Sequence, residues 1–301
     1  MPQHVAAKAC DDAGVSAPAR IGGDPRGANG IRARGSAAAA SMNATASARR
    51  RLLIGVATFV VLAAAWYALT TLTHTISPGR FPSPGESWDA LRQIAVAGYA
   101  DARLHEHVLH SVKLVLFGFA AAAIVGVPLG LAMGASRAFE AFVNPAFLLI
   151  RPIPPLAWIP LAIVWLGLGD AAKVLIIWFA AFVPAVINSY SGVRAIEPYL
   201  VEAARTLGVP RRMLVREVLI PGAMPMIFTG LRLSLQACWT TLVAGELIGA
   251  IAGLGHVLYQ ASLDIFPAMI VVGMAAVAVT GAAMTALLGF AERRAMPWRT
   301  R

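Results

Sequence analysis

The chain has 301 residues, of which 58% are hydrophobic and only 13% are charged, and its net charge is +10. A soluble domain needs roughly a quarter of its residues charged to cover its surface, so this composition excludes a protein surrounded by water alone. The positive charge is as typical of nucleic-acid binders as of membrane proteins with cytoplasmic arginines. The long uncharged stretches favour the second class, and no nucleic-acid partner is expected.

The first 48 residues are rich in Ala, Gly and Arg and have no apolar periodicity, so they are predicted to form a disordered cytoplasmic leader. Met42 lies shortly before the arginines at 49–51 and is an alternative translation start. The apolar run that follows, 52–73, is long enough to cross a membrane. A cleaved signal peptide ending near the alanines at 63–65 is the alternative, which the length of the run disfavours.

Further apolar stretches follow, each close to the ~20 residues that a membrane-spanning helix needs. Their bounds are 114–136, 152–169, 174–193, 221–251 and 265–290. The third span of the chain, 152–169, is short and rich in proline. The sequence therefore predicts an all-α membrane protein with six transmembrane helices.

Arginine and lysine are distributed unevenly around these spans. The leader, counted to residue 51, holds eight basic residues against three acidic ones, and the end after span six holds four arginines against one glutamate. Because basic residues gather on the cytoplasmic side, both termini are predicted to be cytoplasmic, which requires an even number of spans. The interval 194–217 is then also cytoplasmic, and the charge-balanced segment 80–106 is outside. We expect a multi-pass protein of the cell inner (plasma) membrane, with a membrane domain over 49–298 and a tail over 299–301.

The interval between spans four and five carries signals for two short helices. Pro198 suits the first turn of one helix, and Gly208 can take the left-handed conformation that ends it. Pro210 suits the first turn of a second helix, which we expect to run until Pro221. Such a rigid polar bend can transmit force from a soluble partner. The alternatives are an ordinary loop and a DNA-reading helix-turn-helix, and the latter is disfavoured because both ends are held at the bilayer.

This interval matches a family pattern that consists of E-A-A, three residues, G, nine residues and I-x-L-P. The matching residues are Glu202, Ala203, Ala204, Gly208 and Pro221, and Val218 and Ile220 are conservative replacements. The segment resembles the coupling loop of permease subunits of binding-protein-dependent ABC importers. The sequences RPIP at 151–154, WLGLG at 165–169 and GLG at 253–255 are similar to the subfamily for alkanesulfonates, taurine and nitrate. The resemblance extends over roughly residues 52 to 298.

The resemblance implies a fold, a set of partners and a substrate class. A cytoplasmic ATP-binding subunit should receive the two short helices, with Glu202 near the contact and Gly208 permitting the bend. An extracytoplasmic solute-binding protein should deliver the solute, and the permease should form a homodimer surrounded by membrane lipid. The substrate should be a small organic or inorganic anion such as a sulfonate, taurine or nitrate.

Span five carries polar residues on one helix face. Arg232, Gln236, Trp239 and Glu246 recur at helical spacing, with Val243 between the last two. Charged side chains at membrane depth usually face a cavity or a partner, so this stripe is a candidate translocation path. The alternative is that Arg232 and Glu246 extend to opposite membrane interfaces.

Several kinds of chemistry are not expected. The chain has no G-x-x-x-x-G-K-[ST] loop, so ATP must be hydrolysed by a separate subunit. The residues His105, Glu106, His107 and His110 lack the H-E-x-x-H spacing, so neither a metal nor another cofactor is expected. A secondary transporter, which would more often carry an internal repeat, and a membrane enzyme with a catalytic cluster are the rival classes. The coupling pattern favours the importer permease over both.

Overall fold

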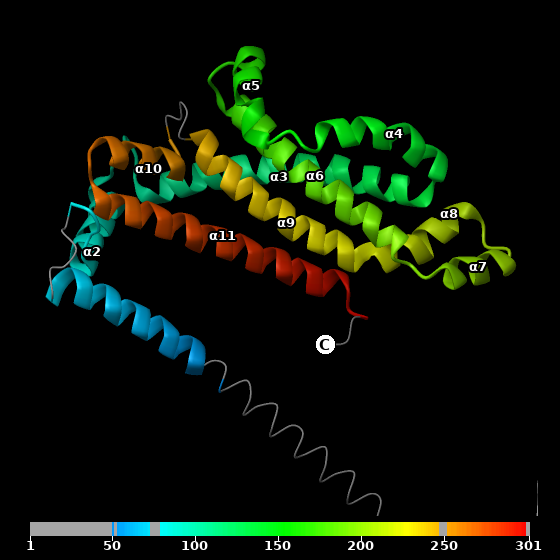
Figure 1. Cartoon of the computed structure of the whole chain (residues 1–301), viewed down its shortest axis with the longest axis horizontal. Helices are drawn as coiled ribbons and strands as arrows, with labels where there is room; N and C mark the ends of the chain where they lie inside the picture. The colour runs from blue at the N-terminus through cyan, green and yellow to red at the C-terminus, as the bar shows by residue number, and fades with distance from the viewer. Residues whose placement is uncertain (1–49, 51–52, 73–78, 247–251, 299–301) are drawn as a thin grey trace, which may run out of the picture. The chain divides into compact units, whose positions relative to one another are not determined.

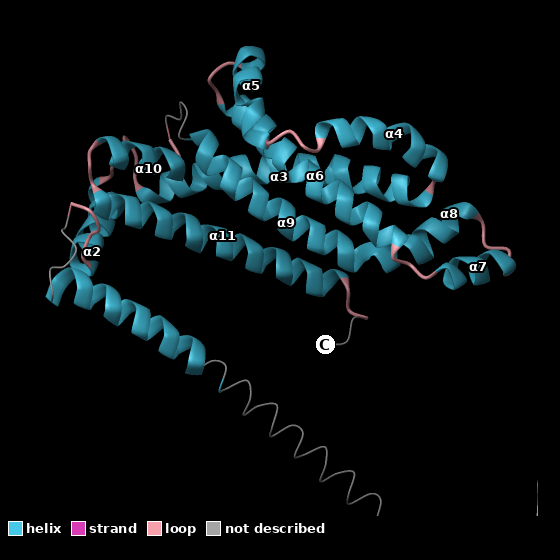
Figure 2. Ribbon diagram, in the orientation of Figure 1, coloured by secondary structure: helices cyan, strands magenta, loops and turns pink. Residues whose placement is uncertain are grey.

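The computed structural model describes residue 50 and the ranges 53–72, 79–246 and 252–298, and the predictions for the leader, Met42 and the tail lie outside these residues. The described residues form helices without a β-strand, which confirms the all-α prediction (Figure 2). The chain divides into two units, Met1–Ala64 and Ala65–Arg301, and the packing described below lies within the second.

Five helices of the described residues are long and apolar enough to cross a membrane. They are Leu53–Leu72, α3 (Leu104–Ala135), α6 (Asp170–Arg194), the continuous run Arg211–Glu246 that contains α9 (Ile220–Glu246), and α11 (Pro267–Ala295). A bent helix pair between α3 and α6 is long and apolar enough to count as one more span. Counted in this way, the described residues carry the six spans that the sequence predicts.

The central helices pack through glycines. A Cβ on Gly130 of α3 would stand 2.4 Å from the Val186 carbonyl oxygen of α6. A Cβ on Gly230 of α9 would stand 2.5 Å from the Asn188 Cβ of α6. Small residues let membrane helices approach closely, which favours van der Waals packing where lipid provides no hydrophobic driving force. Helix α6 therefore lies between α3 and α9 at the centre of the bundle (Figure 1).

The third span differs from the prediction. The sequence predicts one helix over 152–169, whereas the chain forms α4 (Arg137–Ile150), the 3₁₀ turn η3 (Pro155–Trp158) and α5 (Ile159–Leu166), with a bend of 82°. The single-helix prediction is wrong because the run Pro152–Pro155 contains prolines that lack an amide hydrogen, and because Pro154, which precedes Pro155, has a ψ of 138° outside the helical region.

The second short helix also differs from the prediction. We expected it to end at Pro221, but α8 (Arg211–Leu214), the π-helical turn η4 (Val215–Leu219) and α9 form one continuous helix. A proline in a regular helix would clash with the carbonyl of the residue four positions earlier, here Glu217. That residue lies in the π turn, where the wider spacing of carbonyl groups accommodates the ring.

Short helices lie at the two ends of the bundle (Figure 1). The helices α2 (Pro84–Arg92), with its π-helical extension η2 (Gln93–Ala97), and α10 (Leu254–Leu263) lie at one end. The helices α7 (Pro198–Thr206) and α8 lie at the other. Helix α3 begins at Leu104, so the histidine-rich segment that precedes the predicted second span is helical and leads into that span.

Candidate functional site

The segment between α6 and α9 bends sharply. We call residues 198–219, which comprise α7, the bend, α8 and η4, the elbow. Gly208 has φ +74°, which confirms the predicted left-handed conformation at the end of the first short helix. The Val209 amide donates to the Ala204 carbonyl at 3.1 Å and closes the turn. A Cβ at Gly208 would meet nothing within 4 Å, so its backbone conformation alone favours glycine there.

The elbow exposes both polar and apolar side chains. Glu202 and Ala203 are exposed, and Ala204 is half-buried. Leu207 is 82% exposed, and Tyr199 and Met213 are more than half exposed. The same segment exposes arginines at positions 205, 211, 212 and 216. Exposed apolar side chains interspersed with charged ones are typical of a protein-binding surface.

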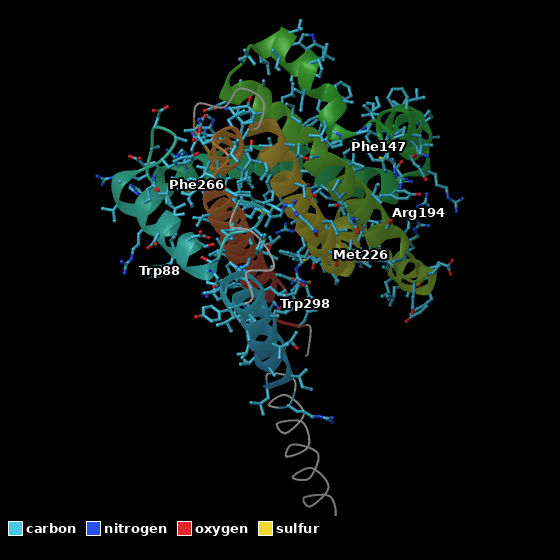
Figure 3. All side chains as sticks on the ribbon, turned by 60° about the vertical axis from the view of Figure 1, so that its left-hand side comes forward. Trp88, Phe147, Arg194, Met226, Phe266 and Trp298 are labelled. Carbon is cyan, nitrogen blue, oxygen red and sulfur yellow. The ribbon has the colours of Figure 1, made fainter. Side chains whose placement is uncertain are left out.

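The elbow is attached to the bundle on both sides. On one side, α6 ends at Arg194 (Figure 3). The Arg194 guanidinium pairs with Glu140 of α4 and lies 5.5 Å from the Tyr190 ring centroid. The Tyr190 hydroxyl donates to the same carboxylate at 2.5 Å. On the other side, the helix continues through Pro221 into α9. The structure therefore brings Glu202, Ala203, Ala204 and Gly208 together on the elbow and leaves Pro221 beyond it.

The sequence did not reveal the cluster of Glu140, Tyr190 and Arg194. Glu140 lies in α4, a helix that the apolar pattern missed because Arg137, Glu140 and Pro145 interrupt it. The spacing of Arg137 and Glu140 indicates only a local i, i+3 pair on α4 and gives no sign of Tyr190 or Arg194. These partners are instead more than forty residues apart in sequence, so no local signal could have found them.

The stripe on α9 has different surroundings at its two ends. The Arg232 guanidinium pairs with Glu292 of α11, and Gln236 is exposed. Trp239 is 6% exposed, and its indole Nε1 has no hydrogen-bond partner among the described residues. A Cβ on Gly281 of α11 would stand 3.7 Å from that indole nitrogen, so α11 covers the middle of the stripe.

Glu246, at the far end of the stripe, is completely buried and does not contact Arg232. Its carboxylate accepts hydrogen bonds from the Ser111 hydroxyl at 2.8 Å and from the Gly255 amide at 2.7 Å. Of the three histidines near the start of α3, only His107 is fully buried, and His105 is exposed. Among the described residues, no three His, Cys, Asp or Glu side chains are grouped to hold a metal ion.

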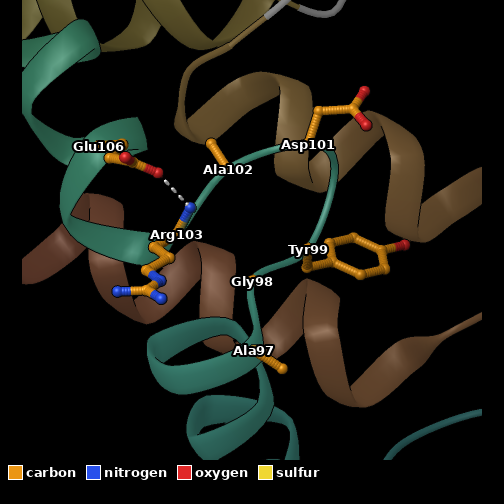
Figure 4. Close-up of a pocket in the computed structure, with 7 residues that line it drawn as sticks. All are labelled: Ala97, Gly98, Tyr99, Asp101, Ala102, Arg103 and Glu106. Carbon is orange, nitrogen blue, oxygen red and sulfur yellow. Dashed lines mark hydrogen bonds between the residues drawn. The ribbon is translucent and has the colours of Figure 1, made fainter.

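Two cavities lie near the end of the bundle that carries α2 and α10. A polar one of about 460 Å³ is lined by residues of the segment 97–106 (Figure 4). Ala100 and Asp101 in this segment have positive φ angles, and burial together with the Asp264 carboxylate raises the pKa of Tyr99. The other cavity, of about 480 Å³, is apolar and lies between Trp66, α2 and α11. Neither cavity is lined by a residue of the stripe or of the elbow. Glu106, from the histidine-rich segment, lines the polar one.

Comparison with known proteins identifies the family. Residues 126–297, more than half of the chain, match the family model described as binding-protein-dependent transport system inner membrane component. The chain belongs to this family. Membership makes the permease a multi-pass inner-membrane protein and implies an ATP-binding subunit and a solute-binding protein as partners. Its relatives are transport permeases and not enzymes, as the sequence predicts.

Individual relatives cover most of the permease. It is 35% identical over 250 residues to the taurine transport system permease protein TauC of Escherichia coli (strain K12), which spans 83% of the permease and 90% of TauC. It is 30% identical over 239 residues to the putative aliphatic sulfonates transport permease protein SsuC of Bacillus subtilis (strain 168), spanning 79% of the permease and 85% of SsuC. It is also 30% identical to the nitrate import permease protein NrtB of Synechocystis, over 66% of the permease and 73% of NrtB. These matches confirm the resemblance to the sulfonate, taurine and nitrate permeases.

The fold is also similar to a solved structure. A chain in an inward-facing structure of the MetNI methionine ABC transporter aligns with a TM-score of 0.54 and 22% identity. The alignment covers 66% of the permease and 96% of that chain. At this level of identity, the similarity concerns the fold alone.

Proposed function

We propose that the permease forms the solute path of an ATP-driven importer and that the elbow couples this path to the ATP-binding subunit. The observation that carries the proposal is the placement of the elbow. It exposes Leu207 and Met213 beside charged residues, it is joined to α6 by residues 195–197 alone, and it continues directly into α9. Both helices belong to the three central ones. A displacement of the elbow by a soluble partner therefore acts on the packed core.

The residues of the elbow have distinct roles in this proposal. The exposed Ala203 permits close approach of a partner backbone, and the Glu202 carboxylate is available to a basic residue of that partner. Within the described part of the chain, the Glu202 side chain forms neither a hydrogen bond nor an ion pair. Gly208 fixes the direction in which α8 leaves the bend. Pro221 acts indirectly, through the π turn that joins the elbow to α9.

We further propose that the solute is a small anion and that the part of the stripe formed by Arg232, Gln236 and Trp239 meets it, whereas the buried Glu246 does not. Relatives named for taurine, aliphatic sulfonates and nitrate support this substrate class. Arg232 supplies positive charge, and the unpartnered Trp239 Nε1–H is a buried donor suited to an anionic oxygen. Because Arg232 already pairs with Glu292, an anion must compete with that carboxylate. The proposal includes cytoplasmic termini and a homodimer within membrane lipid.

Gly208→Val tests the coupling role, and Gly167→Val is its matched control. Both glycines have positive φ angles, +74° and +77°, and a Cβ at either would meet nothing within 4 Å. Each substitution therefore imposes backbone strain of roughly 1 kcal/mol or more without a steric clash. The strain at Gly167 is the larger one, because its ψ of 179° lies in a region essentially limited to glycine, which makes it a stringent control. Only Gly208→Val should prevent copurification with the ATP-binding subunit and abolish solute-stimulated ATP turnover in proteoliposomes. Full stimulation by the Gly208→Val permease would contradict the proposal, as would solute uptake that needs no ATP.

A further inference from the structure

Three features that the sequence presents separately meet at one place. They are Glu246 of the stripe, the histidine-rich start of α3, and the sequence GLG at 253–255. The first amides of α10 each donate a hydrogen bond to a side chain of another helix. Gly253 N donates to His107 Nδ1 at 3.1 Å, Leu254 N to Ser111 Oγ at 2.9 Å, and Gly255 N to Glu246 Oε2 at 2.7 Å. We call the side chains of His107, Ser111 and Glu246 the cradle.

The members of the cradle are also bonded to their surroundings. The Ser111 hydroxyl donates to Glu246 Oε1 at 2.8 Å, and His107 Nε2 lies 2.9 Å from the Tyr99 carbonyl oxygen. His107 must carry its proton on Nε2, because Nδ1 accepts from Gly253. All three side chains have an exposed fraction of 0%. Because the cradle is buried, a broken bond would leave its donor and acceptor without water as a replacement partner, which costs free energy. The Glu246 carboxylate is also stabilised by its position at the N-terminus of α10.

The glycines of the GLG sequence make room for the Glu246 side chain. A Cβ at Gly253 would stand 2.1 Å from Glu246 Oε1, and the φ angle of +130° at this position also favours glycine. A Cβ at Gly255 would stand 2.7 Å from the Cβ of Glu246 and equally close to the Val243 carbonyl oxygen. The other end of α10 is held as well, because the Tyr99 hydroxyl donates to Asp264 at 2.5 Å. Helix α10 is therefore fixed along its length to the segment that begins α3 and to the end of α9.

The position of α10 determines the position of α11. Only residues 264–266 separate the two helices, and Ile265 among them has a φ angle of +51°, which is rare for a β-branched residue. Such a short, strained connection leaves little freedom for one helix to move without the other. Helix α11 in turn covers the stripe on α9, where Gly281 faces Trp239 and Glu292 pairs with Arg232.

We propose that Glu246, Ser111 and His107 are positioning residues, which hold α10 so that α11 keeps its position over the stripe and moves together with α9. Glu246 thus acts on the solute path from outside it. The inference rests on the proposed function, because it assigns a role within ATP-coupled uptake. Loosening the cradle should let α11 move independently of α9, so that ATP is consumed without a corresponding passage of solute.

Ser111→Ala tests the proposal, and Ser189→Ala is its matched control. Both serines are completely buried in central helices, but Ser111 makes two hydrogen bonds in the cradle, whereas Ser189 Oγ has no partner among the described residues. The permease would be purified with its ATP-binding subunit, and hydrogen–deuterium exchange would be measured at the amides of residues 253–255. Ser111→Ala should accelerate this exchange at least tenfold and lower the solute taken up per ATP hydrolysed at least fivefold. Ser189→Ala should change neither quantity.

Each other outcome has a defined meaning. Unchanged exchange in Ser111→Ala would show that the cradle does not fix α10 and would overturn the inference. Faster exchange with unchanged uptake per ATP would also overturn it, because the cradle would then serve stability alone. If Ser111→Ala does not assemble, Glu246→Gln replaces it, since the isosteric amide keeps an acceptor for Gly255 and should give a smaller loss of the same kind. ATP-independent uptake by the unaltered permease would count against the proposed function, while the exchange rates would still decide whether the cradle holds α10.

Discussion

Arg232 lies on α9 with its guanidinium against Glu292 of α11. Its side chain is 49% exposed, so solvent screening limits the pair to roughly 0–1 kcal/mol of stability. The helical period predicted correctly that Arg232, Gln236 and Trp239 share one face of span five. It could not predict the partner of the arginine, because Glu292 is 60 positions away and nothing local links the two residues. The same holds for Glu246, whose partners lie on α3 and α10.

Arg232→Ala should reduce anion uptake at least tenfold while leaving membrane insertion and the thermal midpoint nearly unchanged. A tenfold change in affinity corresponds to about 1.4 kcal/mol, which one lost charge contact with a solute can account for. Glu292→Gln is the control, because it weakens the same pair but keeps the positive charge, and it should retain uptake. Uptake would be measured with radiolabelled taurine, sulfonate and nitrate in proteoliposomes. An equal loss in both variants would show that the ion pair, and not the free charge, is what transport requires.

At the scale of elements, apolar runs located the spans well, because a hydrocarbon core demands a minimum helix length. They failed where the chain bends. The hydropathy of residues 152–169 does not reflect the prolines that separate η3 from α4. It also misses α4, where the charge of Glu140 is stabilised by contacts with Tyr190 and Arg194. The elbow was predicted in type and position, but its connection to α9 depends on a π turn that no sequence signal marks.

Close packing of α3 on α6 predicts a strong effect of one methyl group. Gly130→Ala should destabilise the permease by about 1–3 kcal/mol, because the added Cβ would approach the backbone of α6 to 2.4 Å. Gly245→Ala is the matched control, since Gly245 is also buried in a central helix and a Cβ there meets nothing within 4 Å. The control should be neutral or stabilising by up to about 1 kcal/mol. Thermal unfolding in detergent would compare the two, and equal stabilities would contradict the packing argument.

Glu202→Ala tests the surface of the elbow. Loss of one partner of a desolvated charge pair costs ~2–5 kcal/mol, enough to release most of a moderately tight complex. The variant should insert normally but fail to retain the ATP-binding subunit during purification. Glu217→Ala, which removes another exposed glutamate of the elbow outside the E-A-A sequence, should retain it. Equal retention of the subunit by both variants would exclude Glu202 as a docking residue.

At the scale of the whole molecule, the placement of α2 and α10 opposite α7 and α8 makes the orientation testable. The described residues show two distinct ends of the bundle, and the arginine distribution predicts that the elbow is cytoplasmic. In intact cells, an impermeant thiol reagent should label Ser262→Cys on the exposed side of α10 and should not label Gly208→Cys. Of the two native cysteines, Cys238 is completely buried and Cys10 lies in the leader, which is predicted to be cytoplasmic, so neither should be labelled. Labelling of Gly208→Cys would reverse the proposed topology.

The uninterrupted helix Arg211–Glu246 has a mechanical consequence. Its 36 residues span about 54 Å at ~1.5 Å per residue, with the elbow at one end and the Glu246 carboxylate at the other. A rotation of the helix at Arg211 is therefore transmitted along the helix axis to the cradle. The π turn Val215–Leu219 is the place in this helix where part of the rotation can be taken up. Thermodynamic reciprocity then applies to the two ends. If docking at the elbow weakens the binding of a ligand that holds α10 in place, that ligand must weaken docking by the same factor.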